Sequence, residues 1–137
     1  MIQVFCASKG AGKTKKLIEL ANRQLKDAKG DSVYIDTNSK NRLQLKTNIR
    51  FINVTELGIL DFEGVYGLIC GIISQNYDVE KIYIDHLSNT LNLINEDSIS
   101  SFTRLKEFSQ NFNVDLYINL SCDNKEDIPY FIREYIG

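Results

Sequence analysis

The sequence has no tryptophan, one proline, one histidine and three cysteines among its 137 residues. The cysteines, Cys6, Cys70 and Cys122, are odd in number and form no C-x-x-C pair, which argues against a disulfide scaffold and against a structural zinc site. With His86 as the single histidine, little is present from which to build a histidine-rich metal site or a Ser–His–Asp triad. No apolar run approaches the roughly 20 residues of a membrane-spanning helix. We therefore expect a protein without disulfides and without a membrane span.

We also expect no secretory leader, because Met1 is followed directly by a strand-like segment and not by a basic and then an apolar stretch. The length fits one domain, and a composition of 43% hydrophobic and 25% charged residues is typical of a globular chain. The sequence therefore predicts a single cytoplasmic domain over residues 1–137.

The charge is distributed unevenly along the chain. Residues 1–50 carry 11 basic and 4 acidic side chains, whereas residues 51–137 carry 5 basic and 14 acidic ones, so the net charge of −2 divides into +7 and −9. A basic first segment favours the handling of an anion there. The alternative is a basic first helix whose charges are only solvated on its outer face.

Short apolar runs predict five strands, at residues 2–7, 32–37, 49–54, 81–85 and 114–120. Apolar residues at helical spacing predict four helices, at residues 14–28, 64–76, 99–112 and 128–136. Strands that alternate with helices predict an α/β three-layer sandwich with a mainly parallel sheet of about five strands. We expect the alternating run 49–54 at an edge or in a half-exposed position, and ligands at the carboxyl ends of the strands. The segment 64–76 is apolar nearly all round, so we expect its helix to be buried under other elements.

The most specific motif is the segment Ala7–Thr14, ASKGAGKT, which fits the phosphate-binding pattern G-x-x-x-x-G-K-[ST] with alanine in place of the first glycine. A predicted strand precedes it and a predicted helix follows it, as the motif requires. Gly10 and Gly12 allow the backbone to fold around an anion, Lys13 suits the β- and γ-phosphates, and the Thr14 hydroxyl suits Mg²⁺. The candidate nucleotide-binding residues are Ser8, Lys9, Gly10, Ala11, Gly12, Lys13, Thr14 and Lys15.

A magnesium site also needs a carboxylate at the end of a nearby strand. Asp85, which ends the apolar run 81–85, is the candidate metal ligand together with Thr14, and Lys13 and Asp85 are the candidate catalytic residues. Asp36 ends a run of the same form and is the rival. His86 stands where many ATPases carry a glutamate that activates water, which predicts weak hydrolysis or a base supplied elsewhere.

With these residues in place, the sequence resembles the P-loop NTPases and, within them, the RecA-like ATPase branch, and it is similar in size to small uncharacterised bacterial ATP-binding proteins. In that branch a further strand intervenes between the loop strand and the metal carboxylate, which favours Asp85 over Asp36. Asn119 and Ser121 then fall where a polar residue often senses the γ-phosphate. The loop also looks like that of bacterial-type thymidine kinases, but their Asp-Glu pair and zinc-binding cysteines are missing.

The resemblance implies ATP and Mg²⁺ as cofactors and a slow ATPase that acts as a nucleotide-dependent switch or assembly subunit, with a protein partner or a second copy. A small-molecule kinase that uses Asp36 in an acceptor pocket, and a non-hydrolysing interaction module, stay open as alternatives. GTP stays open too, because Asn124–Asp127 matches the guanine-reading pattern N-K-x-D. Nucleic-acid binding is not indicated, since basic and aromatic residues do not interleave.

Overall fold

The computed structural model describes residues 1–137 and contains five strands and five helices. The strands are β1 (Ile2–Ala7), β2 (Asp31–Asp36), β3 (Ile49–Asn53), β4 (Val79–Ile84) and β5 (Asp115–Ser121). The helices are α1 (Lys13–Gln24), α2 (Phe62–Gln75), α3 (Ser88–Leu91), α4 (Ile99–Phe112) and α5 (Tyr130–Arg133), with single 3₁₀ turns at Arg42–Gln44, Glu96–Ser98 and Lys125–Asp127.

All five strands run parallel in one sheet, in the order β1-β5-β4-β2-β3. The predicted α/β class and parallel sheet are therefore confirmed. The strand β5 lies directly between β1, which leads into the glycine-rich loop, and β4, which leads to Asp85. β3 lies at one edge, as its alternating sequence predicts, and β1 lies at the other.

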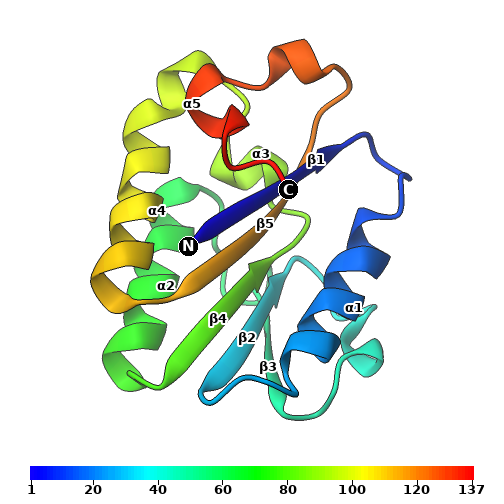
Figure 1. Ribbon diagram of the computed structural model, residues 1–137, viewed down its shortest axis with the longest axis vertical. Helices are drawn as coiled ribbons and strands as arrows, with labels where there is room; N and C mark the ends of the chain where they lie inside the picture. The colour runs from blue at the N-terminus through cyan, green and yellow to red at the C-terminus, as the bar shows by residue number, and fades with distance from the viewer.

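The two faces of the sheet are covered by different helices, with α1 on one side and α2 and α4 on the other (Figure 1). The face under α2, α4 and α5 holds the larger core, a cluster of 25 buried residues that is mainly aliphatic on the strands. The face under α1 holds a smaller cluster of eight buried residues, of which three are tyrosines, Tyr34, Tyr83 and Tyr117. The layers thus form the predicted three-layer sandwich.

The helix α2 begins where Asp61 accepts a hydrogen bond from the Gly64 amide at 2.9 Å, which satisfies one of the free N–H groups of the first turn. The expectation that this helix is buried under other elements holds for one of its faces only. Its buried residues lie on one face, while Gly67 and Gly71 are exposed on the other. Because glycine has no side chain, Gly67 and Gly71 expose little apolar area, and a helix of apolar composition can therefore lie on the surface.

The C-terminal helix is shorter than the predicted 128–136. α5 spans only Tyr130–Arg133, because the chain beyond it turns to β1 and exchanges hydrogen bonds with Val4. The Val4 amide donates to the Tyr135 carbonyl at 2.8 Å, and the Gly137 amide donates to the Val4 carbonyl at 2.9 Å. These residues therefore add a short parallel bridge beside the edge strand.

The three cysteines are free, in agreement with the absence of a disulfide pattern. Burial raises the pKa of the Cys6 thiol to about 12. None of the helices combines the length and the apolar character that crossing a bilayer requires.

Candidate functional site

The loop between β1 and α1 has the backbone that the glycine pattern predicts. Gly10 and Gly12 both have φ of +83°, a conformation that other residues adopt only with strain. Gly12 is the N-cap of α1, so the free amides of the first helical turn face the loop. Lys13 folds back over the loop, and its Nζ donates to the carbonyl oxygens of Ala7 at 3.0 Å and of Ser8 at 3.1 Å. The arrangement offers amides, a helix N-terminus and a mobile ammonium to an anion.

A cavity of about 660 Å³ opens at this loop and has no hydrophobic residue in its lining. Its lining residues are Lys9, Gly10, Gly12, Lys13, Thr14, Asp85, His86, Ser88, Asn89, Asn119 and Ser121. The cavity thus brings together the loop, the carboxyl ends of β4 and β5, and the start of α3.

The sequence-predicted residues divide into two groups at this cavity. Lys9, Gly10, Gly12, Lys13, Thr14 and Asp85 line it, and so do Asn119 and Ser121. Ser8, Ala11 and Lys15 do not. Ala11 borders a second cavity of about 480 Å³ between α1 and β1, which Lys13 and Asn119 also line. Lys15 is exposed on α1. The residues Asn124–Asp127 lie in neither cavity.

Asp85 is almost completely buried, with 2% of its surface exposed, and three donors hold its carboxylate. Oδ2 accepts from the Tyr34 hydroxyl at 2.9 Å, while Oδ1 accepts from the His86 amide at 2.9 Å and from Asn119 Nδ2 at 3.1 Å. Burial and the neighbouring Asp85 raise the pKa of Tyr34, so its hydroxyl stays protonated and able to donate. A carboxylate has about four acceptor positions, so one remains for a further ligand.

Asp36, the rival carboxylate, is fully buried and does not line the cavity. Its Oδ1 accepts from the Thr37 amide at 2.6 Å and lies 2.8 Å from His86 Nδ1, while its Oδ2 has no hydrogen-bond partner. Burial raises the pKa of the Asp36 carboxyl, although the hydrogen bond with His86 acts in the opposite direction. Asp36 therefore lies behind His86, and the acceptor pocket that a kinase would need cannot use it directly.

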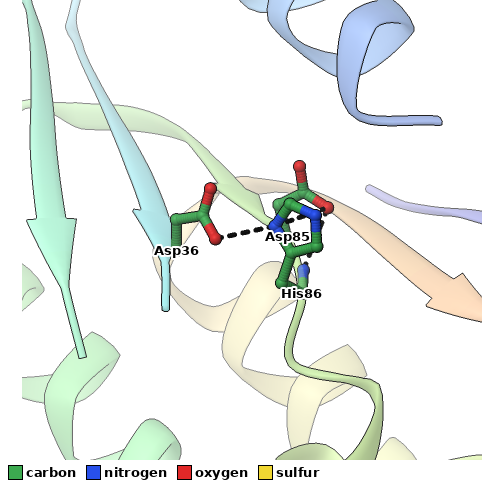
Figure 2. Close-up of side chains that lie close together, drawn as sticks. All are labelled: Asp36, Asp85 and His86. Carbon is green, nitrogen blue, oxygen red and sulfur yellow. Dashed lines mark hydrogen bonds and ion pairs between the residues drawn. The ribbon is translucent and has the colours of Figure 1, made fainter. Parts of the chain in front are cut away.

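His86 connects the buried carboxylate to the loop. Figure 2 shows its ring beside Asp85, with Nδ1 directed at Asp36. The other ring nitrogen, Nε2, lies 3.1 Å from Thr14 Oγ1, and the side chain is 43% exposed. The backbone of His86 has φ of +59°, an uncommon conformation for a residue with a side chain.

The donor groups at the cavity suit Mg²⁺ with a phosphorylated ligand. Mg²⁺ prefers hard oxygen ligands in octahedral geometry and keeps several waters. The Thr14 hydroxyl and the Asp85 carboxylate are such ligands, and both line the cavity beside Lys13. One buried oxygen of a lining residue, Asn119 Oδ1, has no hydrogen-bond partner and can receive a donor from a ligand or its water. Asp36, Asp85 and His86 also place one ligand atom each within 4.8 Å of one another.

The sequence contains a signal for this site that goes beyond the loop motif. The tripeptides Tyr34–Asp36, Tyr83–Asp85 and Tyr117–Asn119 read YID, YID and YIN. The first ends β2, the second reaches one residue beyond β4, and the third lies within β5, two residues before its end. Their parallel register aligns the three tyrosines across the sheet. The polar residues two positions later therefore form a row beside the cavity. Ser88 and Asn89, by contrast, follow no recognisable pattern.

In comparisons with known proteins, no family model and no curated protein matches the chain.

Proposed function

We propose that the chain binds Mg-ATP and acts as a slow, nucleotide-dependent ATPase switch. The observation that carries the proposal is the single polar cavity that Lys13, Thr14 and Asp85 line together at the carboxyl end of a parallel sheet. These three residues come from two segments that are about 70 residues apart, so their meeting is not implied by the loop motif alone. Ligands of open α/β sheets bind at this end of the strands.

The strand order supports the RecA-like branch of P-loop NTPases. β5 separates β1, the strand that precedes the loop, from β4, the strand that precedes Asp85. An intervening strand of this kind is what the resemblance implies. The order therefore favours Asp85, and not Asp36 on β2, as the carboxylate for the metal.

In the proposed reaction, each residue has a distinct task. Lys13 leaves the carbonyl oxygens of Ala7 and Ser8 and binds the β- and γ-phosphate oxygens, where it stabilises charge during phosphoryl transfer. Thr14 and Asp85 hold Mg²⁺ directly or through water, and the bound ion neutralises phosphate charge. Asn119 and Ser121 lie at the end of β5, in reach of the terminal phosphate.

Slow hydrolysis follows from the chemistry around the candidate metal site. No glutamate follows Asp85, and the neighbouring His86 is engaged by both Asp36 and Thr14. We therefore propose that the bound nucleotide controls association with a protein partner or a second copy, and that turnover resets the state.

The test compares the wild type with Lys13→Ala for binding of ATP and GTP in the presence of Mg²⁺. We expect Lys13→Ala to weaken ATP binding by roughly 10- to 100-fold, because a charge-assisted contact contributes about 1.5–3 kcal/mol. Lys26→Ala is the matched control, since it removes the same charge from an exposed position beyond the far end of α1.

Phosphate release without any acceptor separates the ATPase from the alternatives. Release by the wild type and its loss in Asp85→Asn support the proposal. Turnover only with an added nucleoside would indicate a kinase, and binding without turnover would indicate an interaction module. If the wild type binds neither nucleotide, the proposal is wrong.

A further inference from the structure

A chain of contacts joins the fully buried Asp36 to the loop residue Thr14. Asp36 ends β2, His86 follows β4, and Thr14 lies in the first turn of α1. Two contacts make this connection: Asp36 Oδ1 lies 2.8 Å from His86 Nδ1, and His86 Nε2 lies 3.1 Å from Thr14 Oγ1. A group that is inaccessible from the cavity thus contacts, through one side chain, the hydroxyl that the proposed function assigns to the metal.

The surroundings of Asp36 decide which nitrogen of His86 carries the proton. Oδ1 already accepts a hydrogen bond from the Thr37 amide at 2.6 Å, and an ionised carboxylate oxygen can accept a second one from His86. A proton on the carboxyl would reside on Oδ2, which has no partner. The 2.8 Å contact therefore favours the proton on Nδ1, and in a ring with that single proton Nε2 keeps its lone pair.

This tautomer determines the direction of the Thr14 hydroxyl. Because Nε2 is an acceptor, the hydroxyl hydrogen of Thr14 points to His86, and the lone pairs of Oγ1 point elsewhere. Thr14 lines the cavity together with Lys13 and Asp85. The hydroxyl is thus held with its electron pairs available to a cation in that cavity.

The backbone of His86 indicates that its position is held by its neighbours. A residue with a side chain at φ of +59° is strained, and such strain persists only where other contacts fix it. Here the His86 amide donates to Asp85 Oδ1 at 2.9 Å while the ring is held at both nitrogens. Two aspartates therefore hold one histidine, Asp85 at its backbone amide and Asp36 at its ring.

We propose that Asp36 is a positioning residue that acts through His86: it fixes the Nδ1–H tautomer, so that the Thr14 hydroxyl presents its lone pair to the Mg²⁺ of a bound nucleotide. The inference rests on the proposed function for the identity of the ligand. Groups that orient a metal ligand typically change metal affinity by 10- to 100-fold when they are removed. We expect an effect at the lower end of that range, because Thr14 itself remains.

The first measurement needs no nucleotide, and it uses the fact that His86 is the only histidine. The ¹⁵N chemical shifts of its ring distinguish the two neutral tautomers and the doubly protonated ring. We expect the Nδ1–H tautomer in the wild type and in Asp36→Asn, whose amide oxygen can still accept from both Thr37 and His86. Asp36→Val removes the acceptor, and we expect the tautomer preference to be lost. An Nε2–H or doubly protonated ring in the wild type at neutral pH would overturn the inference.

The second measurement is binding of a non-hydrolysable ATP analogue as a function of Mg²⁺ concentration. In Asp36→Val we expect the Mg²⁺ concentration that gives half-maximal binding of the analogue to rise about tenfold. Binding of the metal-free analogue should be unchanged, because it relies on Lys13 and the loop amides. Asp36→Asn should restore most of the loss. Equal weakening with and without metal, or a failure of Asp36→Asn to restore, would make the role merely structural and overturn the proposal.

The two measurements separate failure of this inference from failure of the proposed function. If the wild type binds no nucleotide, the proposed function is wrong, and so is the metal role, although the ring spectrum still reports the tautomer. If nucleotide binds but Asp36→Val leaves its Mg²⁺ dependence unchanged, the proposed function stands and the positioning role is wrong. Thermal unfolding of both variants shows whether each is folded before either comparison is made.

Discussion

The two faces of the sheet are built from consecutive residues of the same strands but differ in chemistry. On β2, β4 and β5, the residues facing α2 and α4 are aliphatic, whereas those facing α1 are Tyr34, Tyr83 and Tyr117. The tyrosine rings stack across the sheet with centroids 6.1 and 5.0 Å apart. We call these the aliphatic face and the tyrosine face. The candidate site lies at the carboxyl end of the tyrosine face alone.

The difference shows which face stabilises the fold and which face contains groups whose burial is unfavourable for folding. The aliphatic face has the larger cluster and needs no polar partners. The tyrosine face has hydroxyls that need partners: Tyr83 donates to Gln24 Oε1 at 2.5 Å, and Gln24 Nε2 donates to Tyr117 at 3.0 Å. Beyond the tyrosines it also buries Asp36 Oδ2 and Asn119 Oδ1 without partners, which is unfavourable for folding.

The largest effect should come from the aliphatic face. Ile118 is fully buried in β5, between β1 and β4, and its neighbour Tyr117 points to the opposite face. Ile118→Ala leaves a cavity in a packed core, so we expect a loss of about 3 kcal/mol in the free energy of unfolding. Urea denaturation followed by circular dichroism measures it.

Tyr117→Phe is the matched control one residue away. It removes only a hydroxyl that accepts from Gln24, so we expect a loss below about 1.5 kcal/mol. A larger loss in Tyr117→Phe than in Ile118→Ala would break the comparison, because the tyrosine face would then be the more stabilising one.

A second, smaller effect concerns the buried carboxylate of the tyrosine face. Burial raises the pKa of Asp36 in the folded state above its usual value of about 3.9. The stability linked to its proton is therefore present below about pH 4 and is lost as pH rises through the higher folded pKa. Asp36→Asn has no such proton, so its stability relative to the wild type should increase from pH 4 to pH 7. Urea denaturation of both proteins at the two pH values measures this difference.

The sign of that pH dependence is the informative result. If the advantage of Asp36→Asn is the same at both pH values, the buried carboxyl does not carry an elevated pKa. If the wild type gains on the variant toward neutral pH, the contact with His86 outweighs burial, and the tyrosine face stabilises its polar end after all.

Much of the fold could be predicted from the sequence, because strand and helix periods are local. All five predicted strands form, at nearly the predicted residues. What local patterns could not supply was the end of the chain, where pairing with Val4, a residue distant in sequence, replaces helix. Apolar composition similarly overstated the burial of α2, because composition does not say which side of a helix is covered.

The candidate site was predictable only in part, for the same reason. The loop motif and the form of the strand before Asp85 are local, and the cavity brings Lys13, Thr14 and Asp85 together. Whether they bind nucleotide stays a prediction. The position of Asp36 behind His86 depends on the order of β2 and β4 and on the backbone at residue 86, neither of which a motif encodes.

The smallest expected effect concerns the connection between β2 and β3, which covers the tyrosine face together with α1. Asn22 on α1 tethers the connection between β2 and β3, since its Nδ2 donates to the Gln44 carbonyl at 2.9 Å and its Oδ1 accepts from the Lys46 amide at 2.8 Å. Asn22→Ala removes both bonds at a partly exposed position, so we expect a global loss of no more than about 1 kcal/mol. The sharper readout is amide hydrogen exchange, which should accelerate at Lys46 and its neighbours while β4 and β5 stay protected. Leu45 of the same segment packs in the core beneath α1. Accelerated exchange that spreads to Tyr34 or Tyr83 would therefore show that the Asn22 hydrogen bonds stabilise the whole tyrosine face. The tyrosine face would then depend on its covering segment more than the aliphatic face depends on any single contact.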